Sequence, residues 1–171
     1  AEGGVVARCR GRMEWGARSL GNRSILASAH DYRVVDDLNK SIKQRDFWMP
    51  FAPSVRADRA ERYLQPSNNV SPDFMMVGYE ATAEGVRDLA AATHPRDGTI
   101  RPQVVSRDAN PQYFRLLELF ERKTGRSGFL NTSFNLHGEP IVYGPGEAVD
   151  VFLRSGLRHL ALDRHLLSKK S

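Results

Sequence analysis

The sequence predicts an α/β (α+β) fold, in which helices pack on a mixed, twisted β-sheet. Short apolar runs bounded by glycine, proline or polar residues alternate with segments that repeat apolar residues every three or four positions. The 171 residues are 40% hydrophobic and 26% charged, which is ordinary for one globular domain with a buried core. Strands that alternate with helices along the chain favour helices packed on a sheet.

The first half of the chain begins with a predicted strand and continues into a predicted helix. Val34, Leu38 and Ile42 recur every four residues, and Asp31 is a suitable N-cap, so we expect a helix that ends near Lys43. Clusters of proline, serine and asparagine predict a loop over residues 65–73. We expect strands over residues 4–10, 51–55 and 74–79, a short buried segment over 22–28, and short helices over 57–64 and 84–92.

The second half carries clearer boundaries. Pro102 interrupts an apolar run over residues 100–106, which indicates an edge strand or a bulge. Asn110 followed by Pro111 predicts a helix start, and Gly125 predicts its end. We expect further strands over residues 128–131, 141–143 and 157–162, and a last helix that opens at Pro145.

Composition excludes several classes of protein. No apolar run approaches the length of a membrane span, and the start of the chain lacks the pattern of a signal peptide. Cys9 is the single cysteine, which excludes an internal disulfide and indicates a reducing, cytoplasmic environment. The net charge is +5, yet the basic residues are spread along the chain without interleaved aromatics, so nucleic acid is an unlikely partner.

A polar loop and two cationic segments are the candidate site. The loop over residues 131–135 presents the hydroxyl of Ser133 and the amide of Asn135 after a short apolar run. Residues 11–24 combine three glycines with arginines, and Lys43 and Arg45 follow the predicted helix. Hydroxyls, amides and guanidinium groups together are typical of a phosphate site. The alternatives are solvated surface arginines and cations that complement a helix C-terminus.

The histidines do not show the spacing of metal ligands, so the sequence predicts no metal site in the protein itself. His94 and His137 lie in polar segments and are the two candidates for contact with a substrate. Ser133 lacks a Gly-x-Ser-x-Gly setting, which argues against a hydrolase nucleophile.

Five motifs occur in one order along the chain. They are Gly11-Arg12-Met13-Glu14-Trp15-Gly16 with residues 17–26, Ile42-Lys43-Gln44-Arg45, residues 50–55, Thr93-His94 with Asp97-Gly98-Thr99, and residues 130–142. From about Gly11 to Leu162 the chain thereby resembles the C-terminal region of the nodulation and antibiotic O-carbamoyltransferase family. Arg96 is an added residue relative to that pattern.

The resemblance implies that residues 1–171 form a single YrdC-like domain, a twisted mixed sheet around a basic cavity. Such domains are expected to make carbamoyl-adenylate from carbamoyl phosphate and ATP, with Mg²⁺ carried mainly by the phosphates. An actin-like N-terminal unit then transfers the carbamoyl group to a hydroxyl of a sugar or natural product. That unit is expected to be a partner absent from this chain.

The resemblance also assigns roles. Lys43 and Arg45 match a Lys-x-Arg pair, and Ser133 and Asn135 match a Ser-x-Asn loop. We expect Lys43, Arg45 and Ser133 to be catalytic. The expected binding residues are Arg18, Arg23, Arg101, Asn135, His94 and His137. Two alternatives stay open at this point: a basic-faced RNA-binding module, and a catalytically silent fragment that docks to the missing unit.

Overall fold

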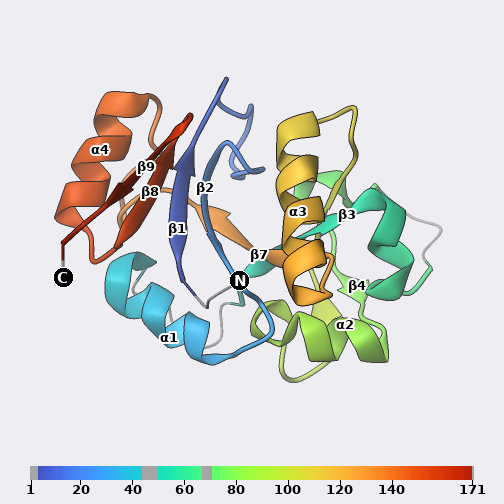
Figure 1. Cartoon of the computed structure of the whole chain (residues 1–171). Coiled ribbons are helices and arrows are strands. Elements are labelled where there is room, and N and C mark those ends of the chain that lie inside the picture. The colour runs from blue at the N-terminus through green and yellow to red at the C-terminus, as the bar shows by residue number, and fades with distance from the viewer. Residues whose placement is uncertain (1–3, 44–49, 67–70, 171) are drawn as a thin grey trace.

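A seven-stranded sheet forms the centre of the molecule in the computed structural model, which describes residues 4–43, 50–66 and 71–170 (Figure 1). The strand order is β6-β3-β7-β2-β1-β8-β9. The strands are β1 (Val6–Cys9), β2 (Arg23–Ala27), β3 (Ala52–Arg56), β6 (Gln103–Val105), β7 (Gly128–Ser133), β8 (His159–Leu162) and β9 (His165–Ser168).

The sheet is mixed, as the sequence predicts. β1 runs antiparallel to β2 and parallel to β8, while β3 runs parallel to β6 and antiparallel to β7. Pro102 separates the edge strand β6 from β5 (Thr99–Ile100), which pairs with β4 (Tyr79–Glu80) in a small second sheet. The predicted effect of Pro102 is therefore confirmed, because an edge strand tolerates the missing backbone N–H.

Four α-helices accompany the sheet in the described part of the chain. They are α1 (Arg33–Leu38), α2 (Ala83–Asp88), α3 (Pro111–Thr124) and α4 (Pro145–Arg154). The caps of α3 are those predicted: Asn110 Oδ1 accepts from the backbone N–H of Tyr113 at 3.1 Å, and Gly125 ends the helix with φ +75°. No described helix combines the length and apolar character that a membrane crossing needs.

Side chains alternate between the two faces of the sheet. On β7, Phe129 packs with Tyr113 and Leu117 of α3, whereas Leu130 belongs to the larger core on the other face. That larger core includes buried residues of α1 and α4, such as Leu38 and Phe152. α3 lies on β3 and β7, so it covers only one part of its face of the sheet (Figure 1).

Two expected strands were wrong, and one strand was not predicted. Of residues 74–79 only Tyr79 lies in a strand, because Met75 has φ +56° after a 3-10 turn at Pro72–Phe74, and the side chains of Phe74 and Met76 are exposed. Residues 141–143 pack beside the end of β7 through one hydrogen bond, from Val142 N to the backbone oxygen of Phe134 at 3.0 Å, without a ladder. β9 was missed, since all four of its residues are exposed and lack an alternating pattern.

The first predicted helix is also different in form. α1 covers only Arg33–Leu38, and the chain then widens into a π-helical turn at Asn39–Lys43. Such wide turns are frequent at functional sites because they re-aim the side chains that follow. Here the turn ends at Lys43.

Candidate functional site

Lys43 and Ser133 meet in the interior, although 90 positions separate them in the sequence. The Nζ of Lys43 donates to Oγ of Ser133 at 3.1 Å and to Oδ1 of Asn135 at 2.7 Å. Lys43 is only 3% exposed, so its ammonium group depends on polar partners in place of water. The structure thus brings together the two motifs that sequence comparison places in one site.

Asn135 is held at both ends of its amide. Its Oδ1 accepts from Ser133 Oγ at 2.7 Å as well as from Lys43, and its Nδ2 donates to the backbone oxygen of Glu139 at 2.6 Å. Since an ammonium group only donates and a carbonyl only accepts, these bonds define which amide atom is oxygen. Ser133 Oγ donates once and accepts once, which leaves one acceptor position toward a bound molecule.

His137 contacts the backbone of the lysine. Its Nδ1 lies 2.8 Å from the carbonyl oxygen of Lys43. A carbonyl oxygen can only accept, so Nδ1 carries the proton in this contact. His137 therefore fixes the end of the π-helical turn, and its contact with a substrate stays a prediction.

A small hollow of about 40 Å³ is lined by Arg18, Arg101 and Ser133, among others. Burial lowers the pKa of Arg101, and the positive charge of Arg18 lowers it further. The Nε of Arg101 is buried and has no hydrogen-bond partner in the described part of the chain. No Asp or Glu is among the described lining residues, so the hollow has the charge of an anion site.

Arg23 lies deeper than the sequence suggests. The whole residue is 5% exposed. Its guanidinium group donates to four backbone oxygens at 2.8–3.0 Å, those of Arg10, Gly11, Asn22 and Tyr143. Four of its five N–H groups thereby bind backbone oxygens of the glycine-rich loop, of Arg10 just before it and of Tyr143. Its predicted role in phosphate binding stays a prediction, with one N–H remaining for it.

Glu14 organises the same loop and was missed in the sequence. Its Oε1 accepts from the backbone N–H groups of Leu20 at 2.8 Å and of Asn22 at 2.5 Å. Gly21 has φ +118°, and a Cβ there would lie 2.6 Å from the ring of Tyr113. Only glycine fits this close approach. The five-residue spacing of the glycines was the one available signal.

A buried polar network supports the floor of the hollow. Asn131 Nδ2 donates to Ser54 Oγ at 3.0 Å and to Gln103 Oε1 at 3.1 Å, and Gln103 Nε2 donates to the backbone oxygen of Leu20 at 2.8 Å. These bonds connect β7, β3 and β6 to the loop that carries Arg18. Gln103 gave no signal in the sequence, because its partners are distant along the chain.

Two predicted site residues remain, His94 and Arg45. His94 Nδ1 is 3.1 Å from Asp97 Oδ1, in the turn that leads to Arg101. Among the described residues, His94 makes no hydrogen bond or ion pair to Lys43, Ser133 or Asn135. Arg45 lies outside the described residues.

The described residues contain no group of three His, Cys, Asp or Glu side chains that could hold a metal ion. The side chains at the site are the hydroxyl of Ser133, the amide of Asn135 and cationic groups. This set does not fit Mg²⁺, which prefers carboxylates.

The family model described as the carbamoyltransferase C-terminus matches residues 1–169. The chain belongs to the carbamoyltransferase C-terminus family. It is 38% identical over 170 residues to MJ1058 of Methanocaldococcus jannaschii, covering 99% of this chain and 27% of that protein. It is 37% identical over 171 residues to the nodulation protein NolNO of Sinorhizobium fredii, covering 100% of this chain and 25% of that protein.

A further relative and a solved structure are similar to the chain in sequence and in fold, respectively. The chain is 36% identical over 142 residues to the 3'-hydroxymethylcephem-O-carbamoyltransferase of Streptomyces clavuligerus, which covers 83% of this chain and 26% of that enzyme. The crystal structure of full-length HypF, in a phosphate- and nucleotide-bound form, superposes with a TM-score of 0.58 at 18% identity and covers 98% of this chain and 24% of HypF. The superposition confirms the predicted fold class. The chain spans about a quarter of the length of these proteins.

Proposed function

We propose that this chain forms carbamoyl-adenylate from carbamoyl phosphate and ATP, which is the activation half of an O-carbamoyltransferase reaction. The supporting observation is that Lys43 donates to Ser133, and that Ser133 lines the same hollow as Arg18 and Arg101. Both substrates are polyanions, and desolvated cations that are fixed before binding stabilise such anions strongly. Membership in the carbamoyltransferase family supports carbamoyl transfer as the general chemistry.

The proposed reaction consumes water and yields inorganic phosphate and pyrophosphate beside the carbamoyl-adenylate. Water cleaves the mixed anhydride bond of carbamoyl phosphate to carbamate and inorganic phosphate. A carbamate oxygen then attacks the α-phosphorus of ATP, and the bond to pyrophosphate breaks. An anion attacks an anion in this step, so the main task of the protein is to offset repulsion and hold the reactants in line.

Each residue has a place in this proposal. Arg18 and Arg101 hold the oxygens of carbamoyl phosphate, and release from mutual repulsion adds to the gain when an anion binds between them. Lys43 stabilises the charge that grows on the α-phosphate. Ser133 offers its remaining acceptor position to the carbamoyl NH₂ group. The predicted set of site residues also includes Arg45, Arg23, Asn135, His94 and His137.

The acceptor and the transfer unit lie beyond this chain in the proposal. The printed name of the Streptomyces relative specifies a hydroxymethyl acceptor on a cephem, and other relatives are nodulation proteins. We therefore propose a natural-product or sugar hydroxyl as acceptor, with transfer carried out by the N-terminal unit of the longer family members.

ATP–pyrophosphate exchange that depends on carbamoyl phosphate tests the proposal. We expect Lys43→Met and Ser133→Ala each to lower the exchange rate about 100- to 1000-fold, because each removes a contact to developing charge in a dry site. Lys40→Met is the matched control, since Lys40 is an exposed lysine in the same π-helical turn and should keep full exchange. Circular dichroism of all three variants confirms the fold.

Two outcomes would count against the proposal. One is normal exchange in both site variants. The other is a wild-type chain with neither exchange nor calorimetric heat on addition of ATP and carbamoyl phosphate, which would favour a silent docking domain. Binding of duplex RNA that weakens with salt and ignores ATP would favour the RNA-binding alternative.

A further inference from the structure

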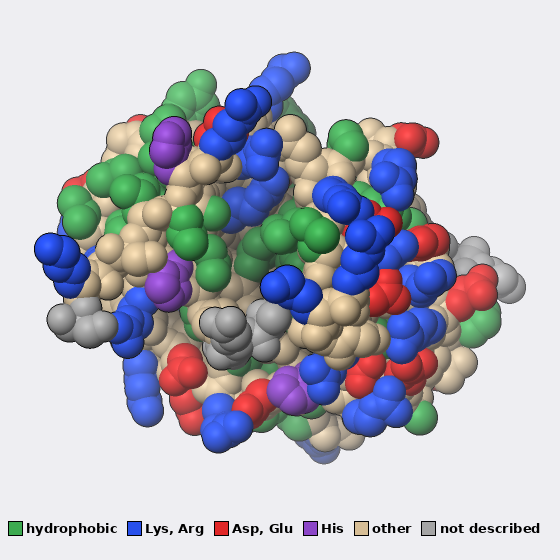
Figure 2. All heavy atoms as spheres, in the orientation of Figure 1, with side chains coloured by type: hydrophobic (Ala, Val, Ile, Leu, Met, Phe, Trp, Pro, Cys, Tyr) green, Lys and Arg blue, Asp and Glu red, His purple; other side chains and the backbone are tan. Residues whose placement is uncertain are grey.

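An apolar groove lies between α3 and the neighbouring strands, on the face of the sheet that α3 covers only in part. Its volume is about 580 Å³. Figure 2 shows a hollow with hydrophobic side chains beside Lys and Arg side chains on this face of the molecule. The described residues along it come from β1, β2, α3, β7 and the end of β8. None of the predicted site residues lines it.

The pattern of side chains shows that the groove is built from regular elements. Val6 and Arg8 alternate on β1 and point to the groove, while Ala7 between them is in the core of the other face. On α3, Leu116, Leu119 and Lys123 recur at helical spacing and line the groove. Leu116 is partly buried and packs against the cluster that contains Tyr113 and Leu117, whereas Leu119 is exposed. The described chain therefore leaves an apolar edge of α3 partly uncovered.

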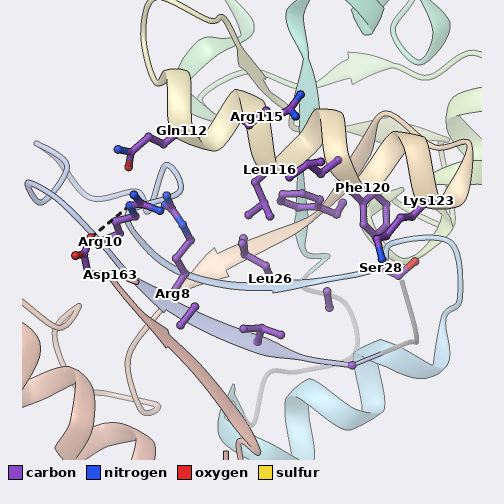
Figure 3. A pocket seen from close by; sticks show the side chains of 16 residues that line it. Arg8, Arg10, Leu26, Ser28, Gln112, Arg115, Leu116, Phe120, Lys123 and Asp163 are labelled. Atoms are coloured by element: carbon purple, nitrogen blue, oxygen red, sulfur yellow. Dashed lines mark ion pairs between the residues drawn. The ribbon is translucent and has the colours of Figure 1, made fainter. Parts of the chain in front are cut away.

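The groove is apolar along its middle and cationic at its ends. In Figure 3, Leu26 and Leu116 lie in the middle of the groove, Arg8 and Arg10 lie at one end, and Phe120 and Lys123 lie at the other. The described lining contains four cationic residues and one acidic residue, Asp163, which pairs with Arg10 at 3.5 Å. Leu119 is 41% exposed, which is unusual for a leucine next to so much other apolar surface.

We propose that this groove docks the polypeptide that precedes this domain in the longer members of the family. The chain covers 27% of MJ1058, so about three quarters of that protein lies outside the match, and the matched family domain is a C-terminus. A preceding unit joins the domain ahead of β1, and Gly4 is itself part of the groove lining. The tether raises the effective concentration of that unit at this surface.

The chemistry of the occupant follows from the lining. In this proposal the occupant presents an apolar ridge flanked by an Asp or Glu side chain that meets Lys123 at the rim, since Arg115 already pairs with Glu118. Lys123 has no ion pair within the described chain, so an acidic partner would not have to displace an existing one.

Cysteine labelling tests the docking. Cys9 is the single cysteine and is 3% exposed, and burial raises its pKa, so a cysteine introduced at the surface is the only reactive thiol of this chain. Leu119→Cys reports on the groove, and Leu166→Cys on β9 is the matched control, because Leu166 is 67% exposed and lies outside the groove. Each variant is labelled with a maleimide, alone and fused behind the unmatched part of MJ1058, and the modified peptide is identified by mass.

We expect the fusion to slow labelling of Leu119→Cys at least about tenfold and to leave Leu166→Cys unchanged. Equal labelling of Leu119→Cys with and without the unit would overturn the proposal, as would equal slowing of both variants. If the fusion does not fold, cysteines at the aligned positions of full-length MJ1058 decide: the groove position must label more slowly than the β9 position. A groove that labels rapidly there and binds an anionic amphiphile instead would also contradict docking.

Discussion

Two groups of arginines in this molecule have opposite surroundings. Arg56 and Arg62 lie around Glu121, and each is paired with a carboxylate on more than one side. Arg18 and Arg101 share a hollow whose described lining has no Asp or Glu, and there the charge of one arginine lowers the pKa of the other. The same residue type stabilises structure in the first group and holds an unbalanced charge in the second.

The difference teaches how to separate structural from ligand-binding arginines. A paired arginine has already exchanged its hydration for a carboxylate, and its removal exposes that carboxylate. An arginine that faces another arginine in a partly buried hollow raises the free energy of the empty protein, and an anion removes that cost when it binds. The two groups should therefore respond to substitution in opposite ways.

The largest expected effect is on ligand binding in the unpaired group. Arg101→Met should lower carbamoyl-phosphate-dependent exchange about 100- to 1000-fold, because a charge that faces the substrate is removed. The same change should leave the thermal unfolding midpoint unchanged or raised, since it removes a partly buried charge and its repulsion with Arg18. Arg59→Ala is the control. Arg59 also pairs with Glu121, its side chain is 46% exposed, and the variant should keep full exchange. A large loss of stability in Arg101→Met would break the comparison.

The next effect is on stability in the paired group. Glu121 accepts from Arg56, from Arg59 at 3.2 Å and from Ser127 Oγ at 2.6 Å. Glu121→Ala should lower the free energy of unfolding by about 1–3 kcal/mol, because the buried Arg56 loses one of its two carboxylates. Urea denaturation measures the change. Asp150→Ala removes an exposed pair with Arg154 and should cost below about 0.5 kcal/mol; equal costs would show that Glu121 is not special.

The smallest effect concerns an exposed pair and its pH dependence. Hydrogen bonds from Arg33 lower the pKa of Asp31 to about 2 from the ordinary value of 3.8. Because the folded pKa is depressed, the stabilising contribution is present above about pH 4 and is lost as pH falls toward 2. Carboxyl NMR titration should show this pKa in the wild type and a pKa raised toward 3.8 in Arg33→Ala, where only the backbone N–H of residue 33 still donates to Asp31. An unchanged pKa in Arg33→Ala would mean that the pair does not form in solution.

Local features made much of the fold predictable. The caps of α3, the edge position after Pro102 and the buried runs of β1 and β7 follow from residues that lie within a few positions of one another. Where local pattern and burial disagree, prediction failed: residues 74–79 are apolar but partly exposed, and β9 is a strand with no buried residue. Exposed apolar residues carry no periodic signal of a strand.

The sequence by itself determined the fold class and the family, because each motif that carries them is contiguous. The pairing of the Lys43 and Ser133 motifs was implied only by the family resemblance. The tertiary structure decided how the charges are used. It assigned four N–H groups of Arg23 to backbone carbonyls, placed Glu14 under the glycine-rich loop and set Arg18 against Arg101. These outcomes depend on which distant segments come together when the sheet forms, and on what remains uncovered afterwards, as in the groove beside α3.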